Sequence, residues 1–444
     1  MLKQKYLYLK TFGCQMNVHD SEQMVELLGG QGYKTTDDVE KADLIIFNTC
    51  SIREKAEQKA YSELGRCRKL KLRKPHLIIG ISGCLAQQLG AKFFKRAPYL
   101  DLVFGTHNIH RLPEMISHVE AAGSRVVETS FHDSVRSLGI LALPRNGSIS
   151  AYVTVMQGCN NFCTYCVVPY LRGREESRKL QDIVNEVVAL ADHGIKEVTL
   201  LGQNVNSYGE TVNGCSGFST LLKEVGGIEG IKRIRFTTSH PKDLSEDIIR
   251  CFAEVDDLCE HIHLPVQSGS DNVIKKMGRY YTSGDYLDKV AELREVCPDI
   301  SITSDIIVGF PGETEEDFQK TVDLMEKVRF DGLFSFKYSE RDGTAAVKFD
   351  NKVSEDVKGE RLQIVQSLQE KHTLERNRAL EGGVEDVLVE GFSKNCRDDV
   401  MGRTRSNKIV NFKGSADIAG KTVPVKITKA YLHSLRGELV WAKG

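Results

Sequence analysis

Three cysteines fall within eight residues in the segment Cys159-Asn160-Asn161-Phe162-Cys163-Thr164-Tyr165-Cys166, with the spacing C-x-x-x-C-x-x-C. Residues 151–158 precede it, read Ala-Tyr-Val-Thr-Val-Met-Gln-Gly, and have the β-branched and aromatic content of a strand. Three thiols on one loop after a strand can hold one face of a metal cluster. The segment therefore predicts a metal site at the end of a strand.

Zinc and an iron-sulfur cluster are the two metal centres to compare for this loop. A structural zinc site usually has four ligands, often as two C-x-x-C pairs, and no fourth Cys or His follows nearby. Three thiolates on a [4Fe-4S] cluster instead leave one iron open to a cosubstrate. The spacing resembles the signature of the radical S-adenosylmethionine (radical SAM) enzymes. We therefore expect a cluster at Cys159, Cys163 and Cys166; the alternative is three incidental cysteines in a loop.

Composition narrows the class of protein. The chain has 444 residues, 41% of them hydrophobic, which corresponds to about three domains and excludes long disorder. The net charge of −1 excludes a polybasic protein but is compatible with a basic patch on one domain. No apolar run approaches the ~20 residues that cross a bilayer, and residues 1–7 lack the continuous apolar core of a signal peptide. We expect a cytoplasmic protein without a membrane partner, whose 12 cysteines are reduced and serve metal binding or catalysis.

Three more cysteines each end a predicted strand in the N-terminal part. Cys14, Cys50 and Cys84 follow the strand-like residues 5–13, 42–49 and 76–83, and helical stretches at 20–28, 51–70 and 86–96 come next. Ser51 and Glu54 have the spacing of a capping box. This alternation predicts a flavodoxin-like parallel α/β domain over residues 1–133. Its parallel strands would bring the three cysteines to one edge; the alternative is that cysteine simply packs well at strand ends.

Residues 148–378 repeat the strand-helix alternation six times. Strands are predicted at 151–157, 197–201, 233–237, 261–264, 300–308 and 333–338, with helices at 180–193, 219–225, 245–254, 283–296 and 314–328. Six units of this kind predict a partial (β/α)6 TIM-like barrel with its site at the carboxyl ends of the strands. Amides, hydroxyls and glycines gather at these ends and suit a nucleoside with an amino-acid tail. The candidate cosubstrate contacts are Tyr165, Gln203, Asn204, Gln267, Ser268 and Asp305, each of which can also serve a loop turn.

Residues 379–444 have a third pattern. After a polar helix at 356–380, short alternating segments with glycine turns predict a small antiparallel β-barrel, with strands at 384–389, 402–404, 409–412, 422–430 and 437–441. This part contains 11 Lys plus Arg and 8 Asp plus Glu. Its basic residues favour contact with RNA; the alternative is a solvated surface. The candidate contacts here are Arg397, Arg403, Arg405 and Lys408.

Taken together, these three parts resemble the methylthiotransferase family over essentially the whole chain. The segments most similar to it are Thr11–Asn17, Asn48–Ala56, Ser82–Gln87 and Arg136–Ile140. The resemblance implies a radical SAM cluster at Cys159, Cys163 and Cys166 and a second [4Fe-4S] cluster at Cys14, Cys50 and Cys84. It also implies that the C-terminal barrel is a TRAM domain, which engages tRNA.

The stretch Arg172-Gly173-Arg174-Glu175-Glu176-Ser177-Arg178 departs slightly from the family's usual Arg-Gly-Glu-Glu, because Arg174 stands where an acid is common. We include Arg172 and Arg174 among the candidate RNA contacts, and the departure puts the details of substrate contact there in question.

The resemblance further implies an activity and partners. Carbon 2 of adenine bears an unactivated C–H bond that a side-chain base cannot deprotonate, so a radical route is expected. The implied reaction adds a methylthio group at that carbon of N6-dimethylallyladenosine, position 37 of tRNA, and consumes two S-adenosyl-L-methionine. The expected partners are the tRNA anticodon stem-loop and an electron donor such as a flavodoxin or ferredoxin, and the chain is expected to be a monomer.

Two kinds of alternative remain at this point. A sister enzyme of the family would act on threonylcarbamoyl-adenosine in tRNA or on an aspartate of a ribosomal protein. A protein of another class would use both clusters only to carry electrons or to hold an RNA-binding fold.

Overall fold

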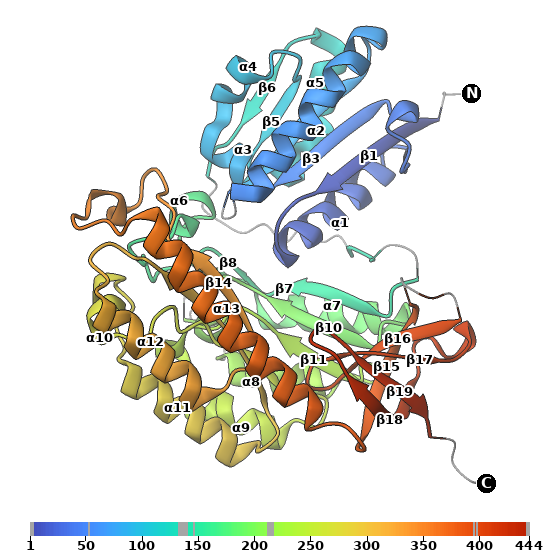
Figure 1. The fold of residues 1–444 in the computed structure, drawn as a ribbon. Coiled ribbons are helices and arrows are strands. Elements are labelled where there is room, and N and C mark those ends of the chain that lie inside the picture. The colour runs from blue at the N-terminus through green and yellow to red at the C-terminus, as the bar shows by residue number, and fades with distance from the viewer. Residues whose placement is uncertain are drawn as a thin grey trace. The chain divides into compact units, whose positions relative to one another are not determined.

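The computed structural model describes residues 4–51, 54–131, 141–144, 147–210, 217–393, 396 and 398–440 (Figure 1). They form two compact units. The first takes in residues 1–146, 152–160 and 167–186, and the second residues 147–151, 161–166 and 187–444. Stretches on both sides of the cysteine loop are thus grouped with the N-terminal sheet, and the division into three domains stays a prediction. None of the described helices is both long and apolar enough to cross a membrane.

The first unit is built on a parallel sheet with the strand order β2-β1-β3-β4-β5-β6. This is the order of flavodoxin-like folds extended by one strand, so the predicted fold class is confirmed. The strands are β1 (Lys5–Thr11), β2 (Tyr33–Thr35), β3 (Leu44–Thr49), β4 (Ile78–Gly83), β5 (Leu102–Phe104) and β6 (Val126–Glu128). The helices are α1 (Gln15–Gly29), α2 (Glu54–Arg73), α3 (Cys84–Leu89), α4 (Phe93–Arg96) and α5 (Leu112–Ala122).

Alternating apolar residues bury both faces of this sheet. On β3, Ile45 and Phe47 join the core formed with α2, α3 and α4, whereas Leu44 and Ile46 join the core formed with α1 and α5. Every residue of β3 and β4 is buried, as expected for central parallel strands with helices on both faces. Because both faces of these strands are covered, the strand ends are the part of the sheet that remains available for a site.

The second unit contains the partial parallel barrel. Strand β10 (Glu197–Leu201) pairs with β11 (Arg233–Phe236), and β13 (Ser301–Val308) pairs with β12 (His261–His263) and β14 (Gly332–Lys337), all in parallel. A parallel bridge between Ile234 and Leu258 joins the two sheets. The N–H groups of Lys196 and Glu197 donate to Ile149 O, which leads into β7 (Ser150–Thr154). The predicted barrel is confirmed.

Helices follow the barrel strands in chain order. They are α7 (Leu180–Asp192), α8 (Phe218–Gly226), α9 (Glu246–Glu254), α10 (Asp271–Lys276), α11 (Ser283–Val296) and α12 (Glu315–Val328). Helix α10 was not predicted, because six residues are too few to show a helical period. Its start is fixed by Ser270 Oγ, which accepts a hydrogen bond from Val273 N. The shorter elements near the cysteine loop are β8 (Met156–Gln157), α6 (Val168–Leu171) and β9 (Glu176–Ser177).

Strand β13 shows which side chains face the barrel interior. Ile302, Ser304, Ile306 and Val308 are fully buried beneath the helices, whereas the residues between them are partly exposed on the opposite face. Asp305 is on that second face and therefore points into the barrel.

The C-terminal part is a closed barrel with the strand order β15-β16-β17-β19-β18. Its strands are β15 (Val384–Phe392), β16 (Asp399–Thr404), β17 (Ile409–Lys413), β18 (Thr422–Ala430) and β19 (Leu435–Leu439), and α13 (Glu355–Arg378) leads into it. The prediction of an antiparallel barrel is wrong for one pair, because β17 and β19 are parallel. A closed ring with an odd number of strands cannot alternate direction all the way round.

Two buried arginines of β11 attach this C-terminal barrel to the central one. Arg233 Nη1 donates to Arg403 O at 2.6 Å, and Arg235 Nη2 donates to Thr404 O at 2.8 Å. Arg235 also forms an ion pair with Glu197, with 3.0 Å between Nε and Oε2. A guanidinium offers five donors, so it can satisfy carbonyls at a strand end and a carboxylate together. The two barrels of the second unit are therefore held by side chains of β11.

Arg405 and Lys408 reinforce the same junction. Arg405 Nε donates to Glu260 Oε2 at 2.8 Å, and Lys408 Nζ donates to Asp331 Oδ1 at 2.9 Å. These two side chains were predicted to bind RNA; the structure places them in ion pairs between the barrels, and their contact with RNA stays a prediction. Arg403 is one-third exposed and pairs with Glu390.

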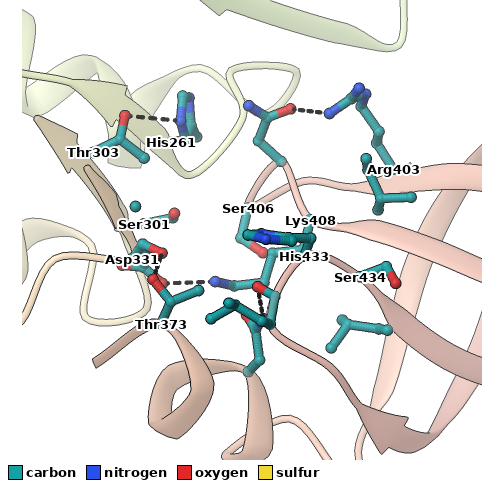
Figure 2. A pocket seen from close by; sticks show the side chains of 16 residues that line it. His261, Ser301, Thr303, Asp331, Thr373, Arg403, Ser406, Lys408, His433 and Ser434 are labelled. Atoms are coloured by element: carbon teal, nitrogen blue, oxygen red, sulfur yellow. Dashed lines mark hydrogen bonds and ion pairs between the residues drawn. The ribbon is translucent and has the colours of Figure 1, made fainter. Parts of the chain in front are cut away.

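A cavity of about 200 Å³ lies at this junction (Figure 2). Its lining includes His261, Ser301 and Gly332, the first residues of β12, β13 and β14, together with Arg403 and Lys408 from the C-terminal barrel. It is therefore at the amino ends of the barrel strands. Chemistry in barrels of this kind takes place at the carboxyl ends, so this cavity is not the expected active site.

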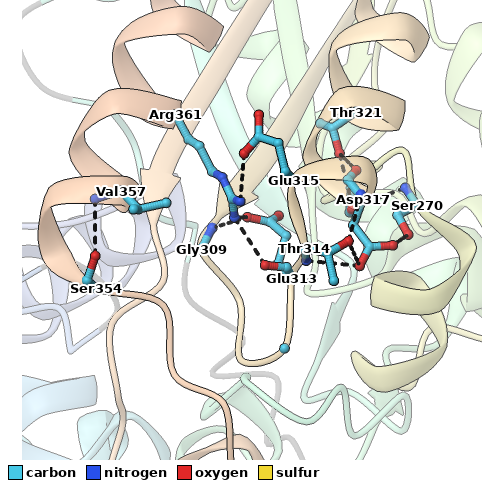
Figure 3. Close-up of polar contacts among 12 residues, drawn as sticks. Ser270, Gly309, Glu313, Thr314, Glu315, Asp317, Thr321, Ser354, Val357 and Arg361 are labelled. Atoms are coloured by element: carbon cyan, nitrogen blue, oxygen red, sulfur yellow. Dashed lines mark hydrogen bonds and ion pairs between the residues drawn. The ribbon is translucent and has the colours of Figure 1, made fainter.

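At the carboxyl end of β13, the loop Gly309–Thr314 is held by polar contacts to α13 and α12 (Figure 3). Glu313 Oε2 accepts from Gly309 N at 2.6 Å and from Arg361 Nη1 at 2.7 Å. Thr314 and Asp317 form a capping box at the start of α12. The polar residues of this loop thus serve its own conformation.

Candidate iron-sulfur and cosubstrate sites

Cys14, Cys50 and Cys84 come at the ends of three strands that are direct neighbours in the first unit, β1, β3 and β4. Cys14 is the N-cap residue of α1, Cys50 follows β3 directly, and Cys84 begins α3. The carboxyl ends of parallel strands meet at one edge, so the fold brings the three thiols there. We refer to them as the N-terminal trio.

Two glycines allow the strand ends to approach so closely. Gly83, with φ +90°, has no room for a Cβ atom, which would overlap Thr49 O and Asn48 Oδ1. Gly13, with φ +140°, would place a Cβ atom 2.8 Å from the Cβ of Cys50. Both glycines precede a cysteine of the trio, and both adopt a backbone conformation that other residues avoid.

We predict that Gly83→Ala destabilises the protein more than Gly32→Ala does. Gly32 also has a positive φ, +82°, but a Cβ there meets nothing within 4 Å. Gly32→Ala should therefore cost only backbone strain, about 1–2 kcal/mol, whereas Gly83→Ala adds an overlap that costs about 1–3 kcal/mol more. Urea unfolding of the two apo-proteins, followed by circular dichroism under anaerobic conditions, measures the difference. Equal midpoints would contradict the close approach of β3 and β4.

A network of amide side chains fixes the same edge. Asn17 Nδ2 donates to Asn48 Oδ1 at 3.0 Å, and Asn48 Nδ2 donates back to Asn17 O at 2.8 Å. The Cys14 thiol donates to Asn17 Oδ1 across 3.3 Å. Both amides are fully buried, so the network holds α1 against the end of β3.

Arg172 is the cation beside the N-terminal trio. It follows α6, is 3% exposed, and donates from Nη2 to Asp20 Oδ2 at 2.8 Å. Helix α6 is placed there because Val167 and Leu171 pack against Cys84. Arg172 was predicted to bind RNA; its guanidinium is buried in this contact, and its contact with RNA stays a prediction. Sequence reasoning missed the pair because its partners are 152 residues apart.

The thiols and Arg172 affect one another electrostatically. Burial raises the pKa of Cys84 to about 11; the Arg172 guanidinium acts against this rise, and the neighbouring thiols of Cys50 and Cys14 add to it. Burial also acts to lower the pKa of Arg172, but Asp20 first and then Cys84 and Cys14 more than offset it. An anionic group at the trio therefore faces the N–H donors of a guanidinium that is already paired with Asp20.

The surroundings of the N-terminal trio contain donors that suit a cluster. Among the described residues, no three His, Cys, Asp or Glu side chains are grouped as ligands of one metal ion. Two hydroxyls beside the trio, Ser51 Oγ and Ser82 Oγ, are buried without a partner among the described residues. Such donors can satisfy the sulfurs of a cluster.

The loop of Cys159, Cys163 and Cys166 spans the boundary between the units. Cys159 belongs to the first unit, where its N–H donates to Gly173 O at 3.2 Å. Cys163 and Cys166 belong to the second unit, where Thr164 N donates to Met277 O at 2.9 Å. That carbonyl comes at the end of α10, so the unpredicted helix helps to position this loop.

Arg279 is a buried cation beside Cys163. It is 4% exposed, and its Nη1 lies 3.9 Å from Cys163 Sγ and donates to Tyr165 OH at 3.0 Å. Nε donates to Tyr281 OH at 2.8 Å, and Nη2 donates to Pro265 O at 2.7 Å. Arg279 was not predicted, because an arginine is ordinarily expected at the surface.

Unpartnered polar atoms collect at the carboxyl ends of β10 and β11. Within the described part of the chain, Asn204 Oδ1, both polar side-chain atoms of Asn206, Ser239 Oγ and His240 Nε2 are buried without a hydrogen-bond partner. The two loops are tied by a bond from Val205 N to Thr238 O at 3.1 Å. Buried polar groups are costly when unsatisfied, so such a group marks a place for water or a ligand.

His240 connects these atoms to the cysteine loop. Its ring contacts that of Tyr281, with 5.7 Å between centroids, and Tyr281 accepts from Arg279. Burial lowers the pKa of His240 to about 2, with Arg279 and Lys242 adding to the effect, so its ring is neutral. The predicted contacts did not include Asn206, Ser239 or His240. All three follow predicted strands and lie before the next predicted helix.

The predicted cosubstrate residues have different surroundings. Asp305 faces the barrel interior, 3.6 Å from His263 Nε2, and Tyr165 accepts from Arg279. Gln267 is buried with φ +70°, and Gln203 is partly exposed. Ser268 is fully buried and its Oγ bonds with Thr321, and its contact with the cosubstrate stays a prediction.

Asn204 turned out to be tied into its own loop. Its Nδ2 donates to Ser207 Oγ at 2.9 Å and to Asp243 Oδ2 at 2.7 Å, which leaves only Oδ1 for a ligand. Arg174 is exposed, as a contact to RNA requires. Three earlier predictions lie outside the described residues in whole or in part: Arg397, the segment Arg136–Ile140, and the capping box of Ser51 and Glu54.

Family models match three parts of the chain. An uncharacterized protein family, UPF0004, matches residues 6–105, the Radical SAM superfamily matches residues 153–325, and the TRAM domain matches residues 378–440. Solved structures share the fold. The chain is similar to the radical S-adenosylmethionine methyltransferase TsrM from Kitasatospora setae, with a TM-score of 0.56 and 15% identity over 74% of this chain and 72% of that one. It is also similar to the cobalamin-dependent S-adenosylmethionine radical enzyme OxsB, with a TM-score of 0.51 and 14% identity over 84% and 57%.

Curated relatives match nearly the full length. A tRNA-2-methylthio-N(6)-dimethylallyladenosine synthase from Syntrophus aciditrophicus is 63% identical over 99% of this chain and 95% of its own. Proteins of the same name from Geobacter metallireducens and Caldicellulosiruptor saccharolyticus are 53% and 48% identical, each over 99% of this chain and over 99% and 93% of their own. Membership of the radical SAM superfamily implies the use of S-adenosylmethionine at an iron-sulfur cluster. The chain therefore belongs to the family of tRNA-2-methylthio-N(6)-dimethylallyladenosine synthases.

Proposed function

We propose that this protein adds a methylthio group to carbon 2 of N6-dimethylallyladenosine at position 37 of tRNA. The observation that carries the proposal is the second set of cysteines, the N-terminal trio at the ends of β1, β3 and β4. A radical SAM enzyme that only abstracts a hydrogen atom needs one cluster, whereas sulfur transfer needs a further site at which sulfur is held. Family membership supports the substrate.

We assign a role to each cysteine set. Cys159, Cys163 and Cys166 would hold the radical SAM cluster, and Cys14, Cys50 and Cys84 a second [4Fe-4S] cluster. When bound, the two clusters would supply the electron that cleaves S-adenosyl-L-methionine and the sulfur that is transferred to the base. In the family, a second S-adenosyl-L-methionine methylates this sulfur, so two are consumed for each product.

The protein's own groups orient and shield these centres. Arg172, already neutralised by Asp20, presents N–H donors to the N-terminal trio without adding net charge. The burial of Cys50 and Cys84 excludes water from one side of that site. Losing either member of the Arg172–Asp20 pair would leave a buried charge alone, at a cost of about 3–5 kcal/mol.

The cosubstrate is proposed to lie over the carboxyl ends of β10 to β13. The unpartnered atoms of Asn206, Ser239 and His240 are donors and acceptors that the ribose, base and amino-acid tail of S-adenosyl-L-methionine can satisfy. Asp305, from inside the barrel, remains a proposed contact, as do Gln203 and Gln267. Neutral His240 is suited to this position, since a cation there would repel the sulfonium.

The proposed partners are the tRNA anticodon stem-loop and a flavodoxin or ferredoxin as electron donor, with the protein acting as a monomer in the cytoplasm. The TRAM domain would hold the stem. Arg174, Arg397 and Arg403 remain proposed RNA contacts, while an unpaired loop base can be extruded into the active site at limited cost.

Nucleoside analysis tests the product. The reconstituted protein is incubated anaerobically with S-adenosyl-L-methionine, dithionite and either tRNA that bears dimethylallyladenosine, tRNA that bears threonylcarbamoyl-adenosine, or the small ribosomal subunit. We expect the mass of a methylthio group on the dimethylallyl nucleoside alone. A methylthio product only on either of the other two substrates would contradict the proposal and identify a sister enzyme.

A further inference from the structure

The guanidinium of Arg279 is buried without a carboxylate partner. Its bonds go to the Tyr165 and Tyr281 hydroxyls and to Pro265 O, which are neutral, and its remaining neighbour is the Cys163 thiol at 3.9 Å. Among the described residues, no Asp or Glu forms an ion pair with it. Transfer of a cation from water to the protein interior costs free energy, and a nearby anion normally offsets that cost.

Three of the other buried arginines have such an anion, whereas Arg233 donates to the backbone carbonyls of Arg403 and Asp386. Arg172 pairs with Asp20 at 2.8 Å, Arg235 with Glu197 at 3.0 Å, and Arg361 with Glu313 at 2.7 Å. The surroundings of Arg279 therefore lack the negative charge that Arg172, Arg235 and Arg361 have beside them. The place where that charge would be is the Cys163 sulfur.

We propose that Arg279 is the fixed counter-charge of the cluster held by Cys159, Cys163 and Cys166, and that it acts through an N–H bond to the Cys163 thiolate. This inference rests on the proposed function, because it requires that the loop holds a cluster. Arg279 is a positioning residue, since it contacts a ligand of the cluster and not the reacting atoms.

The proposal has a consequence for reduction. A cubane with three thiolates is anionic, and one added electron makes it more so. A permanent cation within hydrogen-bond range favours the more negative state, so Arg279 raises the reduction potential. The reduced state is the one that donates an electron to S-adenosyl-L-methionine, so Arg279 increases the fraction of protein ready to react.

The guanidinium is already oriented without the cluster. Tyr281 OH accepts from Arg279 Nε and donates to Val266 O at 2.6 Å. On the other side of the guanidinium, Nη2 donates to Pro265 O. A planar guanidinium that is hydrogen-bonded through both Nε and Nη2 directs the N–H groups of Nη1 in a fixed direction. A lysine at this position keeps a charge but cannot make the same set of bonds.

The test uses the full chain with Cys14, Cys50 and Cys84 all changed to Ala, so that one cluster remains. In this background we compare Arg279, Arg279→Met and Arg279→Lys. The matched control is Arg294→Met, a half-buried arginine of α11 that donates to Val328 O and lies outside both cysteine sets in the chain. Iron per chain is measured, and the midpoint potential is determined by anaerobic titration followed by electron paramagnetic resonance, without S-adenosyl-L-methionine.

We expect Arg279→Met to lower the midpoint potential, Arg279→Lys to lower it less, and Arg294→Met to leave it unchanged, with about four irons per chain in each. If Arg279→Met fails to load iron, the comparison of Arg279→Lys with the parent decides. An unchanged potential in every loaded variant would overturn the inference. So would a change confined to S-adenosyl-L-methionine binding, since Arg279 would then serve the cosubstrate's carboxylate. A parent protein without iron would instead contradict the proposed function.

Discussion

Cys163→Ala is expected to abolish formation of 5′-deoxyadenosine and of the methylthio product together. Cys163 is one of three ligands on the loop and has a buried thiol beside Arg279, so no other side chain can take its place. We expect cleavage of S-adenosyl-L-methionine to fall by at least about 1000-fold, which corresponds to ~4 kcal/mol of barrier. Chromatography of an anaerobic reaction with dithionite measures the deoxyadenosine.

Cys297→Ala is the matched control for this variant. Cys297 is also buried in the second unit, but it caps the end of α11 and belongs to neither cysteine set. It should retain deoxyadenosine formation within a few-fold of wild type. Retained cleavage in Cys163→Ala would contradict the assignment of the radical SAM cluster to this loop.

Cys84→Ala is expected to separate the two chemistries. Loss of one ligand of the N-terminal trio should remove the site at which sulfur is held but leave the radical SAM loop intact. Deoxyadenosine should still form, whereas the methylthio nucleoside should fall by at least about 1000-fold. Both products can be quantified from the same anaerobic reaction by mass spectrometry.

Cys67→Ala controls for the loss of a buried thiol in the same unit. Cys67 belongs to α2 and packs in the hydrophobic core. Cys67→Ala should therefore lower stability but still form both products. Equal loss of deoxyadenosine in Cys84→Ala and Cys163→Ala would refute the division of labour between the two cysteine sets.

The parts of the site that the sequence predicts are those that depend on local spacing. Cys159, Cys163 and Cys166 are recognised because their separation is a few residues, and Cys14, Cys50 and Cys84 because each ends a strand with an unmistakable apolar run. The alternation of strands and helices predicted the parallel sheet and the barrel for the same reason. Its errors were in features with little local signal, such as helix α10 and the parallel pair β17–β19.

The buried charges could not be predicted in this way. Arg172, Arg405 and Lys408 appeared to be surface cations, and each proved to be paired with an acid that is 152, 145 or 77 residues away in the chain. Only the fold decides whether a charged side chain meets water or another charge. Arg279 is the clearest case, because its sequence neighbours give no indication of Cys163, 116 residues earlier.

The central claim is that one chain holds two clusters with separate ligands, and counting iron tests it most directly. Iron and acid-labile sulfide are measured in anaerobically purified wild type and in two triple-alanine variants, one for each cysteine set. We predict about eight irons and eight sulfides in wild type and about four of each in both variants. About four irons in wild type, unchanged when Cys14, Cys50 and Cys84 are replaced, would contradict the account.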